Sequence, residues 1–255
     1  MGTKTMTKND FQTFEKKGEG NLYLSSQLND VEYVYKYIPL VNFLKSYCGR
    51  YLYLADPKKW EDPFETKYLD LISKEPETYD KQCDIKVKAT CFTPLSTKNE
   101  EASWKAYLGS GKDVLRVKID FNALLNQLSN ASKTIYVSKC VYKSRLNIVK
   151  GRIFVKPTKD DSNNQFDLFI NNFSLKQTAY KYENEIRVCA ISNDGTNIES
   201  EVKLDWDEIL KEIVLPPSKE QGNNNLLRMV LMKINRDFIV KESALYDISS
   251  ISMVK

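Results

Sequence analysis

Residues 180–191, Tyr-Lys-Tyr-Glu-Asn-Glu-Ile-Arg-Val-Cys-Ala-Ile, form the stretch of this chain that says most about its fold and its function. Its second half is apolar and typical of a buried strand, and alternate residues of an extended strand lie on one face of a sheet. The pattern predicts a strand over 180–191 that carries Glu183, Glu185 and Arg187 on one side. The opposite side is expected to pack in the core, with Tyr182, Ile186 and Val188.

The charged side of this strand has two interpretations. The plainer one is a solvated sheet face on which Arg187 screens its neighbours. If the face instead lies in a cleft, repulsion between Glu183 and Glu185 raises the pKa of one of them and supplies an acid and a base. The chain contains no histidine, which excludes nucleophile systems and metal sites built on imidazole. Carboxylates are therefore the first candidates for proton transfer.

Strands and short helices alternate along the rest of the chain. Strand-like patterns lie at 31–37, 50–54, 85–92, 117–121, 134–142 and 213–215, and the tail over 238–254 is also β-like. Helical patterns or helix-start signals follow Pro39, Asp62, Thr97 and Asp205 and cover 124–128 and 218–235. This alternation predicts an α+β fold with helices flanking a mixed sheet.

Length and composition indicate one ordinary globular domain. At 255 residues the chain is near the upper limit for one hydrophobic core. Residues 1–21 are polar and rich in lysine, so we expect a flexible N-terminal segment followed by a single α+β domain over 22–255. No apolar run approaches the roughly 18 residues of a membrane span, and the five scattered cysteines contain no C-x-x-C pair. These features predict a soluble protein in a reducing cytoplasm.

The net charge of +4 is modest and its charges are interspersed, so it permits an anionic ligand such as a nucleotide without identifying one. Two nucleotide-binding motifs are absent. Residues 109–113, Gly-Ser-Gly-Lys-Asp, resemble part of a phosphate-binding loop, but position 106 is Ala where that loop needs Gly. No G-x-G-x-x-G sequence is present either.

Other residues suited to a site fall near predicted strand ends or helix starts. Taken singly, each has a purely structural interpretation as a half-buried sheet aromatic, a core aromatic at helical spacing or a strand end. These residues are Tyr33, Tyr35, Lys36, Tyr37, Phe92, Thr93, Trp104 and Tyr107.

Taken in order, these residues resemble a widespread bacterial domain family of unknown function. The family's usual elements are Tyr-Lys-Tyr, Asn-Asp-Pro-Phe-Glu, Cys-Phe-Ser, Trp-x-x-Tyr and Glu-x-Glu-x-Arg. The corresponding stretches here are 33–37, 61–65, 91–93, 104–107 and 182–187, followed by Glu-Ile-Val-Leu at 212–215 and a helix. The resemblance runs from about residue 31 to the C-terminus. Glu61 replaces the usual Asn, and Thr93 replaces the usual Ser while keeping the hydroxyl.

The layout is also similar to that of ADP-ribosyltransferases. In those enzymes an early strand supplies Arg, His or Tyr, a middle strand ends in Ser or Thr, and a late strand supplies Glu, often as Glu-x-Glu. This resemblance implies a mainly antiparallel, split sheet and NAD as the substrate. Loss of nicotinamide passes through an oxocarbenium-like state that a carboxylate stabilises. The resemblance assigns this role, at the ribose 2′-hydroxyl, to Glu185, and orientation or deprotonation of the acceptor to Glu183.

The same resemblance implies a binding role for the remaining candidates. Tyr35 or Tyr37 stacks on nicotinamide, Thr93 bonds the ribose, and Lys36 or Arg187 meets phosphate. Trp104 and Tyr107 form the wall of the pocket.

The leading hypothesis is therefore an NAD-dependent ADP-ribosyltransferase-like enzyme. The resemblance further implies a bacterial toxin or phage-defence effector that modifies protein or nucleic acid and has an antitoxin or chaperone as partner. One alternative is a nuclease that holds Mg²⁺ with Glu183 and Glu185. Another is a non-catalytic binding module that uses the Glu/Arg strand as an interaction face. We expect no resident metal and no membrane partner.

Overall fold

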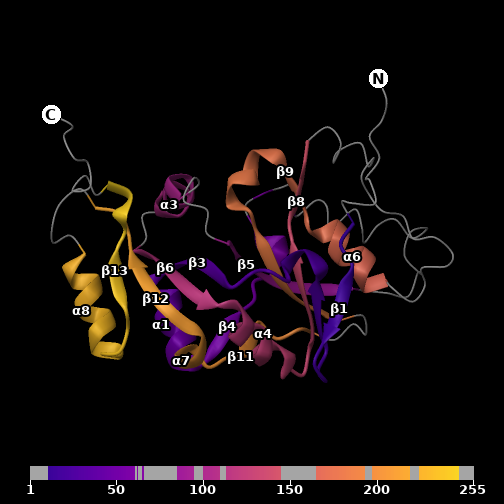
Figure 1. The fold of residues 1–255 in the computed structure, drawn as a ribbon, viewed down its shortest axis with the longest axis horizontal. Helices are drawn as coiled ribbons and strands as arrows, with labels where there is room; N and C mark the ends of the chain where they lie inside the picture. Colours follow the sequence, from indigo (N-terminus) through magenta and orange to yellow (C-terminus); the bar gives the residue numbers. More distant parts are fainter. Residues whose placement is uncertain are drawn as a thin grey trace.

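A computed structural model describes residues 11–60, 62, 65, 85–94, 100–109, 113–144, 165–192, 197–218 and 224–246. These residues form a mixed α/β structure whose sheets are mainly antiparallel, which confirms the expected class at that level. In Figure 1, α3 (Glu100–Leu108) lies on one side of the central strands, whereas α1 (Leu40–Gly49) and α7 (Trp206–Ile209) lie on the other.

The larger sheet has five strands. Its order is β1 (Phe14–Lys17), β2 (Leu22–Ser25), β7 (Thr134–Lys139), β10 (Ile186–Ser192) and β5 (Lys86–Phe92). All neighbours are antiparallel except β2 and β7. Arg187 on β10 lies opposite Cys91 on β5 and Ser138 on β7, so it occupies an interior position of the sheet.

The second sheet has four strands and forms a backbone bridge with the first. Its order is β13 (Val240–Glu242), β12 (Leu210–Leu215), β6 (Val114–Asp120) and β3 (Tyr33–Pro39). The edge strands β3 and β5 are joined through an isolated backbone bridge between Tyr35 and Thr93, whose two hydrogen bonds both measure 2.8 Å. The two sheets therefore adjoin at Tyr35 and Thr93, which are both predicted site residues.

The remaining elements flank these sheets. Two short sheets pair β4 (Tyr51–Tyr53) with β11 (Glu201–Lys203), and β8 (Val141–Lys143) with β9 (Leu175–Gln177). The other α-helices are α4 (Phe121–Ser129), α6 (Gln165–Phe173) and α8 (Asn225–Ile234). Short 3₁₀ helices are η2 (Ser26–Leu28), η3 (Pro57–Lys59), η6 (Thr178–Glu183) and η7 (Ala244–Tyr246).

Local sequence signals account for several helix starts. The α1 helix begins directly after Pro39, as predicted. The Asp120 side chain accepts a hydrogen bond from the Ala123 amide at the start of α4, and Asp205 does the same for Asp207 at α7. Such caps satisfy amide groups that have no partner inside the helix. The predicted signal at Thr97 and most of the one at 61–65 lie outside the described residues.

The core lies on both faces of the five-stranded sheet. On one face Val188 joins the main cluster, which includes Leu124 and Trp206. On the other face Cys189 packs with Phe169 of α6 in a second cluster. Because β10 is covered on both faces, any charged side chain on it must find its partners inside the protein.

The strand expected over 180–191 begins only at Ile186. Residues 178–183 form η6, which ends at Asn184 in the left-handed conformation with φ of 42°. Tyr180 and Tyr182 alternate with charged residues, but this half forms a 3₁₀ helix and not a strand. Asn tolerates the left-handed turn that ends it better than most residues. Glu183 therefore belongs to η6, and the alternation argument holds only for Glu185 and Arg187.

The expected flexible segment at 1–21 is wrong for the residues that the structure describes. Residues 14–17 form β1 and pair along their whole length with β2. Gln12 is buried, its amide donates to Asn171 Oδ1 at 2.8 Å, and its Nε2 donates to the Lys139 carbonyl at 2.7 Å. A long-range pair of this kind leaves no local sequence signal. Residues 1–10 lie outside the described part of the chain.

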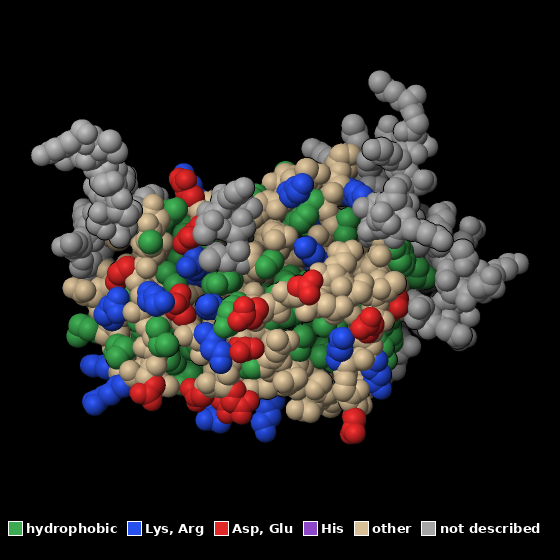
Figure 2. Space-filling model, viewed as in Figure 1, with side chains coloured by type: hydrophobic (Ala, Val, Ile, Leu, Met, Phe, Trp, Pro, Cys, Tyr) green, Lys and Arg blue, Asp and Glu red, His purple; other side chains and the backbone are tan. Residues whose placement is uncertain are grey.

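Positive and negative side chains are mixed on the surface (Figure 2), as they are along the sequence. On the face shown in Figure 2, acidic and basic side chains alternate without a continuous area of one sign. Among the described helices, none has the length and apolar character needed to cross a membrane.

Candidate functional site

Arg187 is a fully buried cation in which each guanidinium nitrogen donates at least one hydrogen bond. The residue is only 1% exposed. Its Nε donates to Glu185 Oε1 at 2.6 Å, its Nη1 donates to the Phe173 carbonyl at 2.6 Å, and its Nη2 contacts the Glu65 carboxylate. The guanidinium also lies 4.9 Å from the ring centres of Trp60 and Phe173. Ion pairing and ring contact together replace the water that Arg187 loses on burial.

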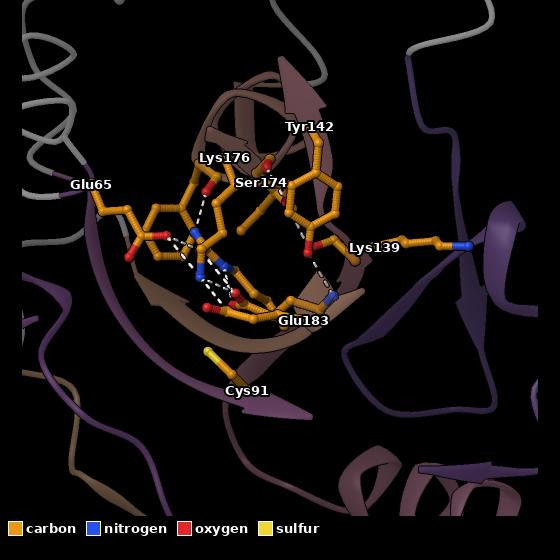
Figure 3. A network of polar contacts seen from close by, with 12 residues as sticks. Glu65, Cys91, Lys139, Tyr142, Ser174, Lys176 and Glu183 are labelled. Carbon is orange, nitrogen blue, oxygen red and sulfur yellow. Dashed lines mark hydrogen bonds and ion pairs between the residues drawn. The ribbon is translucent and has the colours of Figure 1, made fainter. Parts of the chain in front are cut away.

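Lys176 on β9 joins the same cluster. Its Nζ lies 2.6 Å from Glu183 Oε2, 2.6 Å from Glu185 Oε2 and 3.6 Å from Glu65 Oε1. Figure 3 shows the Lys176 and Glu183 side chains pointing toward each other, with Glu65 approaching from the side and Cys91 beyond Glu183. The ion cluster, defined as Glu65, Lys176, Glu183, Glu185 and Arg187, thus links segments distant in sequence.

The backbone around Asn184 brings both glutamates to Lys176. The left-handed turn at Asn184 separates the end of η6 from the start of β10, so Glu183 and Glu185 reach one ammonium from two directions. The Glu185 amide donates to the Tyr142 hydroxyl at 2.8 Å, and its carbonyl accepts from the Cys140 amide at 2.8 Å. These two hydrogen bonds fix the backbone of Glu185.

The two glutamates have opposite electrostatics. Burial disfavours the charge of Glu185, but the neighbouring Arg187 and Lys176 outweigh this and hold its pKa well below the ordinary value. Burial raises the pKa of Glu183, and Lys176 only partly offsets that effect. The Glu183 side chain is 24% exposed, against 3% for Glu185. Glu183 is therefore the carboxylate that can meet a ligand and change its protonation.

The solvated interpretation of the charged face is wrong for Glu185 and Arg187, because both are buried. A phosphate-binding role for Arg187 is also unsupported, since a ligand would have to displace Glu185, Glu65 or the Phe173 carbonyl from it. Sequence reasoning missed Lys176 entirely. Glu65 is the last residue of the motif at 61–65, but the resemblance gives it no role.

A pocket at the junction of the two sheets gathers most of the predicted site residues. Its volume of about 20 Å³ is room for about one water molecule. Its lining combines aromatic rings, hydroxyl groups and carboxylates and comes from β3, β5, α3, η6 and the residues that adjoin them. The lining residues are Tyr35, Tyr37, Cys91, Phe92, Thr93, Ser103, Tyr107, Glu183 and Glu185.

Aromatic stacking closes this junction pocket. The rings of Tyr37 and Tyr107 stack with their centres 5.1 Å apart and their planes at 8°. The Tyr107 residue is 41% exposed. Burial of its hydroxyl, with Cys91 and Glu183 nearby, raises the pKa of Tyr107 well above its usual value. Trp104 is buried behind Tyr37 at an edge-to-face distance of 4.9 Å, so it supports the wall without lining the pocket.

Lys36 does not share this pocket, in contrast to the prediction. Neighbouring residues of a strand point to opposite faces, and Lys36 points away from the face that carries Tyr35 and Tyr37. Its Nζ donates to Thr90 Oγ1 at 2.7 Å and to the Cys91 carbonyl at 3.0 Å. It lines a different cavity on the α1 side of the sheet.

The carboxylates are arranged around a cation of the protein itself. The Lys176 ammonium lies between Glu183 and Glu185, where a divalent ion shared by the two would have to sit. Within the described parts of the chain, no group of three or more acidic, cysteine or histidine side chains is suited to hold a metal. The geometry therefore lends no support to a Mg²⁺-dependent nuclease.

Comparisons with known proteins add no identity: no family model, no curated protein and no solved structure matches the chain. The resemblance to the bacterial family and to ADP-ribosyltransferases stays a prediction.

The left-handed turn at Asn184 yields a direct test of how the site is built. Replacing Asn184 with Val is expected to lower the free energy of unfolding by about 1–2 kcal/mol, because a β-branched residue is poorly tolerated at positive φ. Asn184→Gly should remain close to the wild type, because Gly adopts this conformation readily. Urea denaturation measures both. Equal stability of the Val and Gly variants would contradict the turn.

Proposed function

We propose that the chain is an NAD-consuming, ADP-ribosyltransferase-like enzyme whose reactive carboxylate is Glu183. The observation that carries this proposal is the junction pocket, where two adjoining sheets bring Tyr35, Tyr37, Thr93 and Glu183 to one place. The order of the motifs supports an ADP-ribosyltransferase-like fold as part of the proposal. Without histidine, a carboxylate is the natural group for this chemistry near neutral pH.

The roles of the two glutamates in this proposal follow from their surroundings. Both oxygens of Glu185 already contact Arg187 or Lys176, so Glu185 positions its neighbours and is not the ribose-contacting group that the resemblance implies. Glu183 is the partly exposed carboxylate. As the glycosidic bond breaks, nicotinamide leaves with the bonding electrons and positive charge develops on the ribose, which the Glu183 carboxylate stabilises. An acceptor nucleophile then bonds to the ribose carbon and releases its proton.

Binding of NAD requires the pocket to open. A volume of about 20 Å³ cannot hold a nicotinamide ring. The parallel stack on Tyr37 indicates that a planar ring fits against that face, and the half-exposed Tyr107 is the ring that a nicotinamide would replace. In this proposal Thr93, at the bridge between the sheets, bonds the ribose.

The biological setting of the proposal rests on the resemblance. We propose a cytoplasmic toxin or phage-defence effector that transfers ADP-ribose to protein or nucleic acid, with an antitoxin or chaperone as its partner. The pocket itself carries no feature that selects among these acceptors.

Nicotinamide release tests the proposed reaction. The purified chain is incubated with NAD alone, with total RNA and with cell lysate, and free nicotinamide is quantified in each case. Release in at least one condition is expected, and it should persist in EDTA because no metal is involved. No release in any condition refutes the transferase. Nucleic-acid degradation that EDTA abolishes would indicate the nuclease instead.

A matched control shows whether the loss of activity is specific to a glutamate of the site or follows from removing any glutamate. Glu101 is an exposed glutamate of α3 that forms an ion pair with Lys105 at 2.6 Å. The Glu101→Gln variant should release nicotinamide at the wild-type rate. If charge-reversed variants of Glu183 lose a protein partner while no NAD is consumed by any form of the chain, the binding module is the better description.

A further inference from the structure

A second cavity lies on the side of β3 to which Lys36 points, and Tyr37 lines both this cavity and the junction pocket. It has a volume of about 600 Å³, within the range of small-molecule sites. Residues of β3, α1, β4 and β5 line it, and they include Lys36, Lys45, Tyr51, Tyr53 and Thr90. Neither the motifs nor the proposed transferase assigns this cavity a role.

Lys36 is the unusual feature of this cavity. Lys36 is partly buried, and its ammonium donates to two neutral acceptors, the Thr90 hydroxyl and the Cys91 carbonyl, and lies 5.1 Å from the centre of the Phe92 ring. No carboxylate of the described residues forms an ion pair with it. Glu185, on the other face, is already neutralised by Arg187 and Lys176. Charges that lose part of their water in a protein are normally paired, and the partly buried Lys36 has no ion-pair partner among the described residues.

The remaining lining favours an anion with a planar portion. Lys45 of α1 adds a second ammonium, and Glu201 is the carboxylate that faces the cavity, so the charged lining is positive on balance. Tyr51 and Tyr53 are two residues apart on β4 and lie on one side of that strand. Tyr53 is exposed and can stack with a planar ring at the mouth of the cavity.

We propose that this cavity binds a mononucleotide-sized phosphate ester, with its phosphate beside Lys36 and its planar base against Tyr51 and Tyr53. Lysine binds phosphate as a point charge, and a phosphate here supplies the missing counter-charge. Burial lowers the pKa of Lys36, and an adjacent phosphate opposes that effect by favouring the ammonium. The proposal does not depend on the transferase.

Calorimetry on the full chain tests this site with AMP, inorganic phosphate and adenosine as probes. AMP is expected to bind, phosphate to bind more weakly and compete with AMP, and adenosine to bind much more weakly than AMP. The Lys36→Met variant should bind AMP about 10- to 100-fold more weakly, which corresponds to one lost hydrogen bond to a charged group. The proposal is overturned if AMP does not bind the wild type or binds Lys36→Met equally well.

Three further variants keep the test decisive. If Lys36→Met does not fold, replacing the exposed Lys45 with Met should weaken AMP binding about twofold to fivefold. The Lys233→Met variant on α8, a residue that does not line the cavity, should leave AMP binding unchanged. Glu183→Gln should also leave AMP binding unchanged, because Glu183 belongs to the junction pocket. If AMP binding is lost in Glu183→Gln but kept in Lys36→Met and Lys45→Met, the ligand lies in the junction pocket and the proposal is overturned.

Discussion

An Arg187→Met variant is expected to lose about 3–5 kcal/mol of its free energy of unfolding, the usual cost of removing one partner from a buried ion pair. Methionine keeps much of the side-chain volume, so packing against Trp60 and Phe173 changes little. The loss arises because Glu185 and Glu65 remain buried with Lys176 as their one remaining cation among the described residues. The Phe173 carbonyl also loses its donor. Urea denaturation, with far-ultraviolet circular dichroism as the signal, measures the change.

An exposed arginine is the matched control for Arg187. The Arg50 side chain is 64% exposed and lies 3.2 Å from Asp205, so Arg50→Met should cost no more than about 1 kcal/mol. A comparable loss in the two variants would mean that the ion cluster contributes no more than a surface pair. If Arg187→Met does not express as a folded protein while Arg50→Met does, the ranking is the same and agrees with the expectation.

Sequence patterns predict the parts of the fold that carry a local signal of their own, even where the strands they pair with are distant. The β3, β5 and β6 strands follow from apolar and aromatic runs, α1 from Pro39 at its start, and α4 from the helical pattern at 124–128. The parts that escaped prediction depend on distant partners. Gln12 pairs with Asn171, and Arg187 pairs with Glu65, and neither contact leaves a local pattern.

The candidate site follows the same division. The ordered motifs contain Tyr35, Tyr37, Thr93 and Glu183, and these four residues line one pocket in the structure. Lys36 lies between the two tyrosines and therefore has to face the other way. The relative roles of Glu183 and Glu185 could not be predicted, because they depend on Lys176, for which the sequence contains no signal.

Nicotinamide release by a Glu183→Gln variant is expected to be slower by about 10²- to 10³-fold, the usual effect of losing one electrostatic stabiliser of a transition state. Glutamine keeps the shape of the side chain but cannot carry the charge. Because Glu183 is partly exposed and its neighbour Lys176 keeps Glu185 as a partner, the variant should stay folded. The measurement combines initial rates at saturating NAD with a urea denaturation curve of the same preparation.

The pH dependence of the wild type adds a second readout. The reaction needs the ionised carboxylate, and the pKa of Glu183 is raised, so activity should fall as the pH decreases through a value above the ordinary glutamate pKa of about 4.3. A group with a lowered pKa, such as Glu185, would place that loss below the ordinary value instead. An acid limb below about 4.3 would therefore point to Glu185 as the reactive carboxylate.

Glu185→Gln distinguishes a positioning residue from the reactive one. The substitution would leave Arg187 and Lys176 with less negative charge around them, so this variant should lose stability as well as activity. Glu183→Gln should lose activity alone. If Glu183→Gln retains the wild-type rate while Glu185→Gln, assayed below its own unfolding transition, loses it, Glu185 is the ribose-contacting carboxylate. That result would also require the cluster around Glu185 to rearrange when NAD binds, because both its oxygens are engaged without it.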